Sequence, residues 1–239
     1  MRLDKLIAAG AGLSRSAARE IIRQGRVNLN GEVTRSPDAR ADEGSVITLD
    51  GKPLAAETQR HILLNKPIGV LTAARDPHQK TVMELLPEQL RRLKCMPVGR
   101  LDKDTEGLLL FTTDGELAHR LLSPKRGVDK VYIASVTGLL SEPDQAAFEA
   151  GVALSDFTAR PAMLEILQAD EHSSEARVTL HEGKHRQVRR MFGALGHEVT
   201  TLKRVRFGPI SLDEHLKPGS FRDITEGELA SLRRAAGFD

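Results

Sequence analysis

The chain lacks the residues that support secretion, membrane insertion and thiol chemistry. It has one cysteine, Cys95, in 239 residues, which excludes an internal disulfide and any zinc site built from cysteines. No run of about eighteen apolar residues occurs, so no transmembrane helix is expected. The N-terminus, Met1 to Lys5, lacks the apolar core of a signal peptide. We therefore predict a cytoplasmic protein without a membrane partner.

Aromatic residues and the common site motifs are also missing. The chain has no tryptophan, seven phenylalanines and one tyrosine, so a platform that stacks the bases of any single strand is not expected. It contains no Gly-x-Gly-x-x-Gly, no P-loop and no Gly-x-Ser-x-Gly. His181 and His185 are four residues apart, but Gly183 lies between them and no third ligand is apparent. We predict no metal site.

Positive charge is clustered, although the net charge is only +2. One cluster lies in the N-terminal part, where Glu20 is the only acid among four arginines, Arg15, Arg19, Arg23 and Arg26. The other has Glu198 as its only acid among seven basic residues, Lys184, Arg186, Arg189, Arg190, Lys203, Arg204 and Arg206. Such patches on a near-neutral chain favour a polyanionic partner, whereas ordinary solvated helix faces are the alternative.

The N-terminal region predicts two helices and a hairpin. Apolar residues at positions 3, 6 and 7 predict a short amphipathic helix, and Ser14 is a good N-cap for a second helix that Gly25 can end. Asn30-Gly31 lies between two short strand-like segments and predicts a tight hairpin, because both positions accept a positive φ. A further strand is expected from Ser45 to Leu49.

Three arginines of the second predicted helix share one face. Arg15, Arg19 and Arg23 recur at four-residue spacing, which places them one above another on a helix. We therefore predict that residues 1–55 form a small domain that binds RNA or DNA. A polar segment without periodicity, residues 56–60, is the predicted linker to a domain of residues 61–239.

The larger domain predicts an α+β fold. Strands are expected at residues 61–67, 70–72, 107–113, 130–137, 163–167, 176–180 and 198–205. Helices are expected at residues 81–86 and 87–93, after the N-cap Asp114, at residues 187–195, and after a capping box of Thr225 and Glu228. Irregular spacers between the strands, together with few helices, favour a mixed, mostly antiparallel sheet.

A polar loop runs directly into the strand predicted at residues 107–113. It places Asp102 on a short turn at a sheet edge, beside Arg100 and between Gly99 and Gly107. Catalytic groups are often built on such turns, because the sheet holds the loop still while the loop reaches the substrate. A solvated turn is the alternative, and the residues of this loop alone leave both interpretations open.

Four blocks of the sequence match, in order, the motifs of one enzyme family. They are Leu64-Asn65-Lys66-Pro67-Ile68-Gly69, then Gly99-Arg100-Leu101-Asp102 with Thr105-Glu106-Gly107-Leu108, then Lys130-Val131-Tyr132, and last the basic stretch from Glu182 to Met191. Together they resemble the RNA pseudouridine synthases, specifically the RsuA-type branch. The N-terminal module resembles the small RNA-binding domain of a ribosomal small-subunit protein, so the resemblance covers nearly the whole chain.

This resemblance implies the isomerisation of uridine to pseudouridine within RNA. The glycosidic carbon–nitrogen bond is broken, the uracil turns, and a bond forms through ring carbon 5, with no redox cofactor, nucleotide or metal. Because the target base lies in folded RNA, the enzyme must extrude it. Residues 76–78, 119–124 and 151–154 are most similar to the member of the branch that modifies one uridine of 16S rRNA. A 23S rRNA enzyme, a non-catalytic RNA-binding or ribosome-assembly protein, and a helix-turn-helix DNA binder are the alternatives.

The resemblance also implies roles for three residues. Asp102 would be the essential carboxylate, which either attacks the ribose or base covalently or abstracts a ribose proton. Tyr132, the only tyrosine, would lie against the uracil, although core packing is the ordinary role of a tyrosine on a strand. Arg189 would pair with Asp102 and hold its carboxylate ionised and oriented.

Further residues are predicted to meet the RNA. Arg100 would help displace the flipped base or grip a nearby phosphate, and Arg190 would meet phosphate because it points away from Arg189 on the same helix. The remaining predicted RNA contacts are Lys184, Arg186, Arg15, Arg19 and Arg23. Gly99 and Gly107 would let the backbone approach the extruded nucleotide. The expected partner is ribosomal RNA, either naked or in a partly assembled small subunit, and the expected state is a monomer.

Overall fold

The computed structural model describes residues 1–42, 44–54 and 59–238. The chain divides into two compact units, of which the first holds Met1–Arg60 and Leu86–Cys95 and the second holds His61–Leu85 and Met96–Asp239. Residues 86–95 thus fall with the N-terminal unit, although the sequence places them in the larger domain. The predicted linker, residues 56–60, lies outside the described residues except for Gln59 and Arg60.

The first unit packs helices against a small antiparallel sheet. Its helices are α1 (Leu3–Gly10), α2 (Arg15–Arg23) and α3 (Glu88–Arg92), and its strands are β1 (Val27–Leu29), β2 (Glu32–Thr34), β3 (Ile47–Leu49) and β4 (Lys52–Pro53). The strands follow the order β2-β1-β3-β4. The N-cap prediction is confirmed, because the Ser14 hydroxyl accepts a hydrogen bond from the Ala17 N–H at 3.1 Å. The predicted hairpin is present too, with Asn30 and Gly31 both at positive φ.

Among the described residues of this unit, one charged side chain is buried. Asp4 of α1 is fully buried, and its carboxylate accepts hydrogen bonds from the guanidinium groups of Arg2, Arg15 and Arg19 at 2.9–3.2 Å. The bond from Arg2 is the largest cause that holds the pKa of Asp4 well below its usual range, and it outweighs the opposing effect of burial. Arg23 lies apart from this group, with Glu20 at 4.0 Å.

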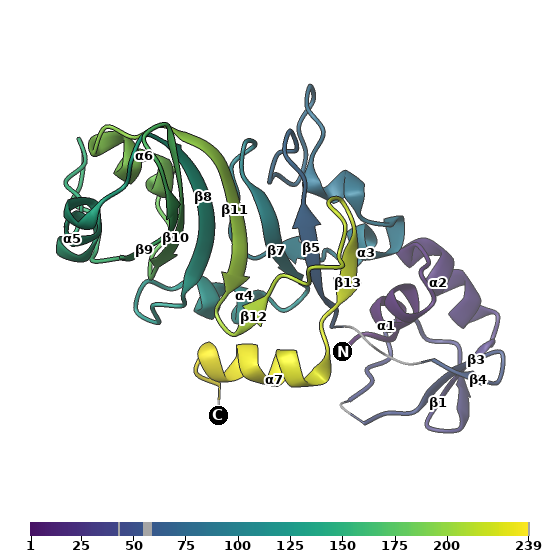
Figure 1. Ribbon diagram of the computed structural model, residues 1–239. Helices are drawn as coiled ribbons and strands as arrows, with labels where there is room; N and C mark the ends of the chain where they lie inside the picture. The colour runs from purple at the N-terminus through teal and green to yellow at the C-terminus, as the bar shows by residue number, and fades with distance from the viewer. Residues whose placement is uncertain (43, 55–58, 239) are drawn as a thin grey trace. The chain divides into compact units, whose positions relative to one another are not determined.

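The second unit is built on one large sheet, which Figure 1 shows from β5 to β9. Its described strands are β5 (His61–Lys66), β6 (Met96–Pro97), β7 (Glu106–Thr112), β8 (Lys130–Thr137), β9 (Met163–Ala169), β10 (Ser173–Leu180), β11 (Val199–Phe207), β12 (Ile210–Ser211) and β13 (Phe221–Asp223). The main order is β13-β5-β7-β11-β8-β10-β9, while β6 pairs with β7 and β12 with β11. All of these pairs are antiparallel except β7 with β11, which confirms the predicted mixed sheet.

Helical segments flank this sheet. They are η1 (Val82–Leu85), α4 (Gly115–Leu122), α5 (Glu142–Ala150), α6 (Gln187–Ala194) and α7 (Glu226–Ala235). Figure 1 shows α5 and α6 beside β9 and β10. The predicted caps are confirmed, since Asp114 accepts from two backbone N–H groups of α4 at 3.0 Å, and Thr225 and Glu228 form a capping box. None of the described helices is long and apolar enough to cross a membrane.

The sequence-based expectations differ from this architecture in several elements, among them the short strands β4, β6, β12 and β13, which were not predicted. The strand predicted at residues 70–72 is wrong, because only Leu71 forms an isolated bridge there, with Thr81. Helix α5 was not predicted, although it begins with a capping box of Ser141 and Asp144.

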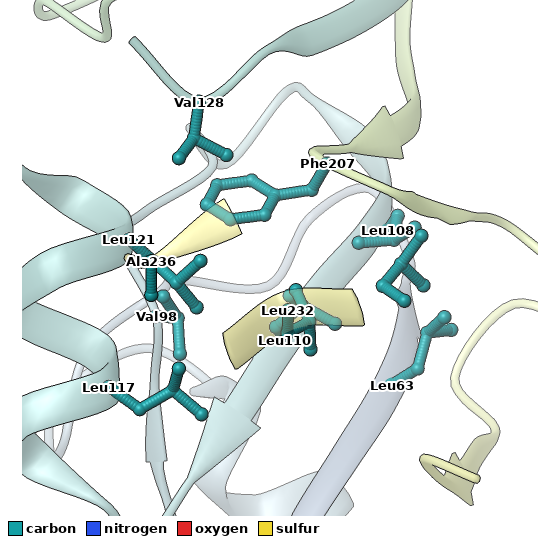
Figure 2. Packing of buried hydrophobic residues seen from close by; sticks show 11 residues of the cluster. Leu63, Val98, Leu108, Leu110, Leu117, Leu121, Val128, Phe207, Leu232 and Ala236 are labelled. Atoms are coloured by element: carbon teal, nitrogen blue, oxygen red, sulfur yellow. The ribbon is translucent and has the colours of Figure 1, made fainter. Parts of the chain in front are cut away.

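One hydrophobic core of the second unit lies between the sheet and two helices (Figure 2). Leucines of β5, β7, α4 and α7 form it together with Phe207 at the end of β11, and each is at most 1% exposed. Phe207 belongs to this core and also lines the cavity described below. The cavity wall is therefore continuous with the packed interior, which holds it in place.

Candidate active site

A cavity of about 680 Å³ opens in the second unit. Its lining includes the loop that holds Asp102, the first residues of β8, the segment between β10 and α6, and the second half of β11. Five residues predicted from the sequence line it, namely Asp102, Tyr132, Arg100, Lys184 and Arg186. The predicted site residues Arg189 and Arg190 are not part of this lining.

A buried lysine holds the Asp102 loop through hydrogen bonds to its backbone. Lys66, at the end of β5, donates hydrogen bonds from Nζ to the carbonyl oxygens of Thr105 (2.8 Å), Asp102 (3.0 Å) and Pro67 (3.1 Å). Burial lowers the pKa of Lys66 to about 8, against the opposing attraction of nearby acids. Three carbonyl groups on one ammonium fix the backbone around Asp102, so Lys66 is a positioning residue.

The segment after β5 adds two further ties to the same loop. The Thr72 hydroxyl donates to the carbonyl of Leu101 at 2.7 Å, and the Gly69 N–H donates to the carbonyl of Lys103 at 2.8 Å. The first matched block and the residues after it thus support the loop of the second block.

Arginines hold the loop from the other side through Asp104. Arg186 donates two hydrogen bonds to the Asp104 carboxylate, at 2.8 and 3.1 Å, and Arg189 donates to the Asp104 carbonyl at 2.8 Å. Nε of Arg189 lies 3.2 Å from the same carboxylate, and its Nη1 donates to the carbonyl of Val199 at 2.6 Å. Burial of Asp104 acts to raise its pKa, but the two arginines outweigh it, so the net shift is downward.

The predicted pairing of Arg189 with Asp102 is therefore wrong. Arg189 pairs with Asp104, two residues further along the loop. The Asp102 carboxylate has no hydrogen bond or ion pair to any residue that the structure describes, and its residue is only partly buried in the cavity wall. The loop is thus fixed through its backbone and through Asp104, while the carboxylate of Asp102 is available to a ligand.

A bulge in β11 completes the opposite wall. Arg204 pairs with Tyr132 and Phe207 pairs with Lys130, but the register shifts between Arg204 and Arg206, which leaves one extra residue in β11. Since directly paired residues share a face of the sheet, both Arg204 and Phe207 stand on the face of Lys130 and Tyr132. Residues three apart on a regular strand point to opposite faces, so it is the bulge that lets both side chains line the cavity.

The side chains on this wall are closely grouped. Tyr132 is 9% exposed, so its ring is held in the wall as the sequence predicts for either of its roles. The ammonium of Lys130 lies 5.3 Å from the centre of the Phe207 ring, and the guanidinium of Arg204 lies 5.2 Å from it, within the range of a cation–π contact. Burial, followed by the charge of Arg204, lowers the pKa of Lys130 to about 8.

Sequence reasoning missed Arg204, Lys130 and Lys66 as site residues. Lys130 and Lys66 stand inside matched blocks, and Lys130 is two residues from Tyr132 on one strand, which was the available signal. Arg204 gave no such signal, because basic residues surround it and its burial depends on the bulge.

The two glycines of the loop are required by packing within the protein. Gly107 has φ +104°, and a Cβ atom there would overlap the backbone carbonyl of Arg204 on the neighbouring strand. Gly99 has φ +78°, and a Cβ atom there would lie 2.9 Å from a methyl carbon of Leu122. Both glycines therefore permit close packing within the protein; Gly99 also lines the cavity, and the approach of a nucleotide to these glycines stays a prediction.

The predicted RNA contacts are distributed around the cavity and on α6. Arg100 is exposed and has no hydrogen bond or ion pair to the described residues, so it is free at the cavity rim. Arg190 pairs with Asp156 and stands 5.2 Å from the centre of the Phe157 ring, and Lys184 stands 5.7 Å from the same ring. Their contact with RNA stays a prediction. Within the described ranges, no group of three or more metal-ligating side chains occurs.

Comparison with known families gives two matches along this chain. Residues 60–194 match the RNA pseudouridylate synthase family, and residues 1–47 match the S4 domain.

Relatives match over the full length. An uncharacterized RNA pseudouridine synthase of Aquifex aeolicus (strain VF5) is 40% identical over 241 residues, which cover 100% of this chain and 96% of the relative. The ribosomal small subunit pseudouridine synthase A of Escherichia coli (strain K12) is 39% identical over 236 residues, which cover 97% of this chain and 100% of the relative. A crystal structure of a pseudouridylate synthase shares 35% identity with a TM-score of 0.68 and covers 97% of this chain and 99% of that one.

Proposed function

Because this chain belongs to the RNA pseudouridylate synthase family and is therefore an isomerase, we propose that it converts a uridine of 16S ribosomal RNA to pseudouridine. The family and the S4 domain together imply that the chain binds RNA. The relatives named for the ribosomal small subunit, which align over their whole length, support 16S rRNA as the target.

The observation that carries the proposal is the state of Asp102. Its carboxylate has no partner among the described residues, while its backbone is tied by Lys66 and by the segment after β5. A free carboxylate on a fixed loop is what a reacting group needs, since it can meet the substrate without first breaking a bond. Tyr132 in the facing wall supplies a flat surface for an extruded base.

Asp102 can serve the reaction in two ways, and both begin from this unpaired carboxylate. It can attack C1′ of the ribose while the glycosidic electron pair leaves on N1 of uracil. Ring carbon 5 of the turned uracil then displaces it, and the proton of carbon 5 leaves as N1 gains one. Alternatively, it removes the C2′ proton as the glycosidic bond breaks, and returns that proton after carbon 5 has bonded to C1′. Slowed turnover of RNA that carries deuterium at C2′ supports the second route; an unchanged rate supports the first.

The direct test of the function removes the negative charge of the Asp102 side chain. Asp102→Asn should abolish tritium release from rRNA transcripts labelled at uracil carbon 5, by about 10³-fold or more, as for other essential catalytic groups. Glu149→Gln is the matched control, because Glu149 is an exposed carboxylate on α5, outside the cavity lining. Undiminished release by the Asp102 variant would rule out this function and favour a non-catalytic RNA-binding protein.

The target RNA is tested separately. Carbodiimide-dependent stops of reverse transcriptase should disappear at one 16S rRNA position in a deletion strain and return with the wild-type gene. Loss of a 23S rRNA stop would instead assign the chain to a large-subunit enzyme of the same family.

The form of the substrate and of the enzyme completes the proposal. The enzyme acts as a monomer in the cytoplasm, on rRNA that is naked or part of an incompletely assembled small subunit. The large apolar residues exposed in the described part of the chain are mostly on different segments, for example Val33 on β2, Ile68 after β5 and Leu139 after β8, while Met163 and Leu167 share β9. Sedimentation of the purified protein tests the monomer, and parallel assays on naked 16S rRNA and on assembly intermediates identify the substrate.

A further inference from the structure

The cavity contains two buried cations whose hydrogen-bonding capacity is largely unused. Arg204 is 2% exposed, and the structure gives its guanidinium one hydrogen bond, from Nε to the carbonyl of Leu108 at 2.8 Å. Its Nη2 is inaccessible and has no partner among the described residues. Lys130 is 8% exposed, and Val128, whose carbonyl lies 2.7 Å from the ammonium, is its only acceptor among the residues that the structure describes.

Unused donors of this kind are costly unless a ligand satisfies them. A guanidinium carries five N–H donors and an ammonium three, and buried charged donors without acceptors destabilise a fold. Contact with the Phe207 ring offsets part of this cost for both cations, but it supplies no acceptor atom in the plane of the guanidinium. Both side chains line the same cavity as Asp102, so an entering ligand can supply acceptors to those of their donors that reach the cavity surface, which the inaccessible Nη2 of Arg204 does not.

The acids of the cavity do not fill this role. Glu182 is engaged elsewhere, since it accepts hydrogen bonds from the Gln187 side chain at 2.7 Å and the Arg160 backbone N–H at 3.0 Å. Asp102 has no ion pair with Arg204 or Lys130 in the structure. The acids of the cavity lining therefore leave these donors without an acceptor.

We propose that Arg204 and Lys130 form a subsite that binds the carbonyl oxygens of the extruded uracil; this inference rests on the proposed function. A base is favoured over a backbone phosphate because these cations are almost inaccessible, so only a group that enters the cavity beside Tyr132 and Phe207 can reach them. Uracil presents two carbonyl oxygens, whereas cytosine presents an amino group at carbon 4. Donors that face that position repel cytosine, so the subsite also selects uridine.

The test couples single atoms of the substrate to single residues of the enzyme. Once the target uridine is mapped, RNA is ligated with 2-thiouridine or 4-thiouridine at that position, which replaces one carbonyl oxygen at a time with a poor acceptor. We expect single-turnover rates of the wild type to fall about ten- to a hundredfold for the contacted oxygen, the effect of losing one hydrogen bond to a charged donor. Arg204→Lys or Lys130→Met should react slowly with uridine and show little further loss with the thio substrate.

Controls separate binding of the base from loss of structure. Arg160→Lys changes a more exposed cation of the cavity lining and should keep the full sensitivity to sulfur. If the Arg204 or Lys130 variants are slow but as sensitive to sulfur as the wild type, the two residues act only on structure and the inference is overturned. If neither thio substitution changes the single-turnover rate of the wild type, the inference is overturned whether or not the variants fold.

Two other outcomes point to different conclusions. Inhibition of the wild type by inorganic phosphate that is absent in Arg204→Lys would assign the subsite to a phosphate and overturn the uracil inference. Absence of pseudouridine from unmodified 16S and 23S rRNA treated with the wild type would instead remove the proposed function, before any thio substrate is compared.

Discussion

Asp4 in the N-terminal unit and Arg204 in the second unit are both charged side chains with almost no contact with water, but their partners differ. Asp4 accepts five hydrogen bonds from three arginines. Arg204 makes a single hydrogen bond and leaves Nη2 without an acceptor among the described residues. Lys66 shows that the second unit can satisfy a buried cation fully, since it donates to three carbonyl groups.

This difference separates structural from functional charge. Where a buried charge has all its partners inside the protein, as at Asp4 and Lys66, it fixes the elements that carry those partners. Where partners are missing beside a cavity, as at Arg204 and Lys130, the protein retains capacity that only a ligand uses. Substitutions at the first kind should reduce stability first, and those at the second kind should change the response to the substrate.

The largest expected effect on stability comes from a substitution at Gly107, which would displace the backbone of Arg204 while leaving its side chain unchanged. Gly107→Ala places a Cβ atom against the carbonyl of Arg204 and at an unfavourable positive φ, which together cost about 3–5 kcal/mol of unfolding free energy. Urea denaturation should show this loss together with loss of tritium release. Gly115→Ala, at a glycine of α4 with no atom near its Cβ position, is the control. Unchanged stability of the Gly107 variant would mean that β7 and β11 do not pack this closely.

A smaller loss of stability is expected at Asp4. Asp4→Asn keeps the shape but removes the charge that the three arginines share, and their half-exposed guanidinium groups can turn to water, so we expect about 2 kcal/mol. Hydrogen exchange should show the loss in α1 and α2 and not in the large sheet. If stability is unchanged while the rate with thio substrates changes, the division between structural and functional charge fails.

Titration of Lys130 should change the rate about tenfold. With a pKa lowered to about 8 by burial and by Arg204, against Asp129 and Glu182, Lys130 loses its charge as pH rises through 8, and the single-turnover rate should fall about tenfold one unit above. Lys130→Arg should remove this decrease. Persistence of the decrease in that variant would assign it to Lys66, whose pKa is also about 8.

Stability should respond to the same titration with the opposite sign. Between pH 8 and the usual lysine pKa of 10.5, the unfolded chain binds a proton at Lys130 that the folded protein does not. The contribution of Lys130 to the unfolding free energy therefore increases with pH over this interval, while the rate decreases.

The smallest expected effect is at Arg23, which is exposed and only loosely paired. Arg23→Gln should weaken binding to rRNA about threefold and reduce the slope of binding against salt by about one unit, with no change in melting temperature. Arg19→Gln should lower both affinity and melting temperature, because Arg19 also bonds to Asp4.

Replacing Arg15, Arg19 and Arg23 together should reduce affinity more than it reduces single-turnover chemistry. A collapse of chemistry with intact binding would contradict the assigned role of this helix.

The sequence predicts those parts of the fold that depend on local signals. Ser14, Asp114 and Thr225 act as caps because each bonds to its own helix, so the information lies within a few residues. Helix α5 was not predicted because Phe148 is its only buried residue, and one large apolar residue gives no periodicity. The segment at residues 70–72 has the composition of a strand but only one bridging residue, since pairing depends on distant segments.

The site is predictable only as far as its motifs extend. They bring Asp102 and Tyr132 into one cavity, as expected. They do not decide whether Arg189 pairs with Asp102 or with Asp104, because both lie on one loop and its backbone direction is set by Lys66 and Thr72. Nor do they predict the burial of Arg204, which depends on strand pairing.

The extra residue in β11 makes the length of this strand matter more than the identity of Val205. Arg204 and Phe207 are three residues apart, so on a strand without this bulge they would point to opposite faces, and Lys130 would lose its aromatic neighbour although every cavity residue would still be present in the sequence. An alignment scored by residue identity would register no difference. Any effort to transplant this wall into another scaffold must therefore reproduce the bulge between Arg204 and Phe207 as well as the side chains.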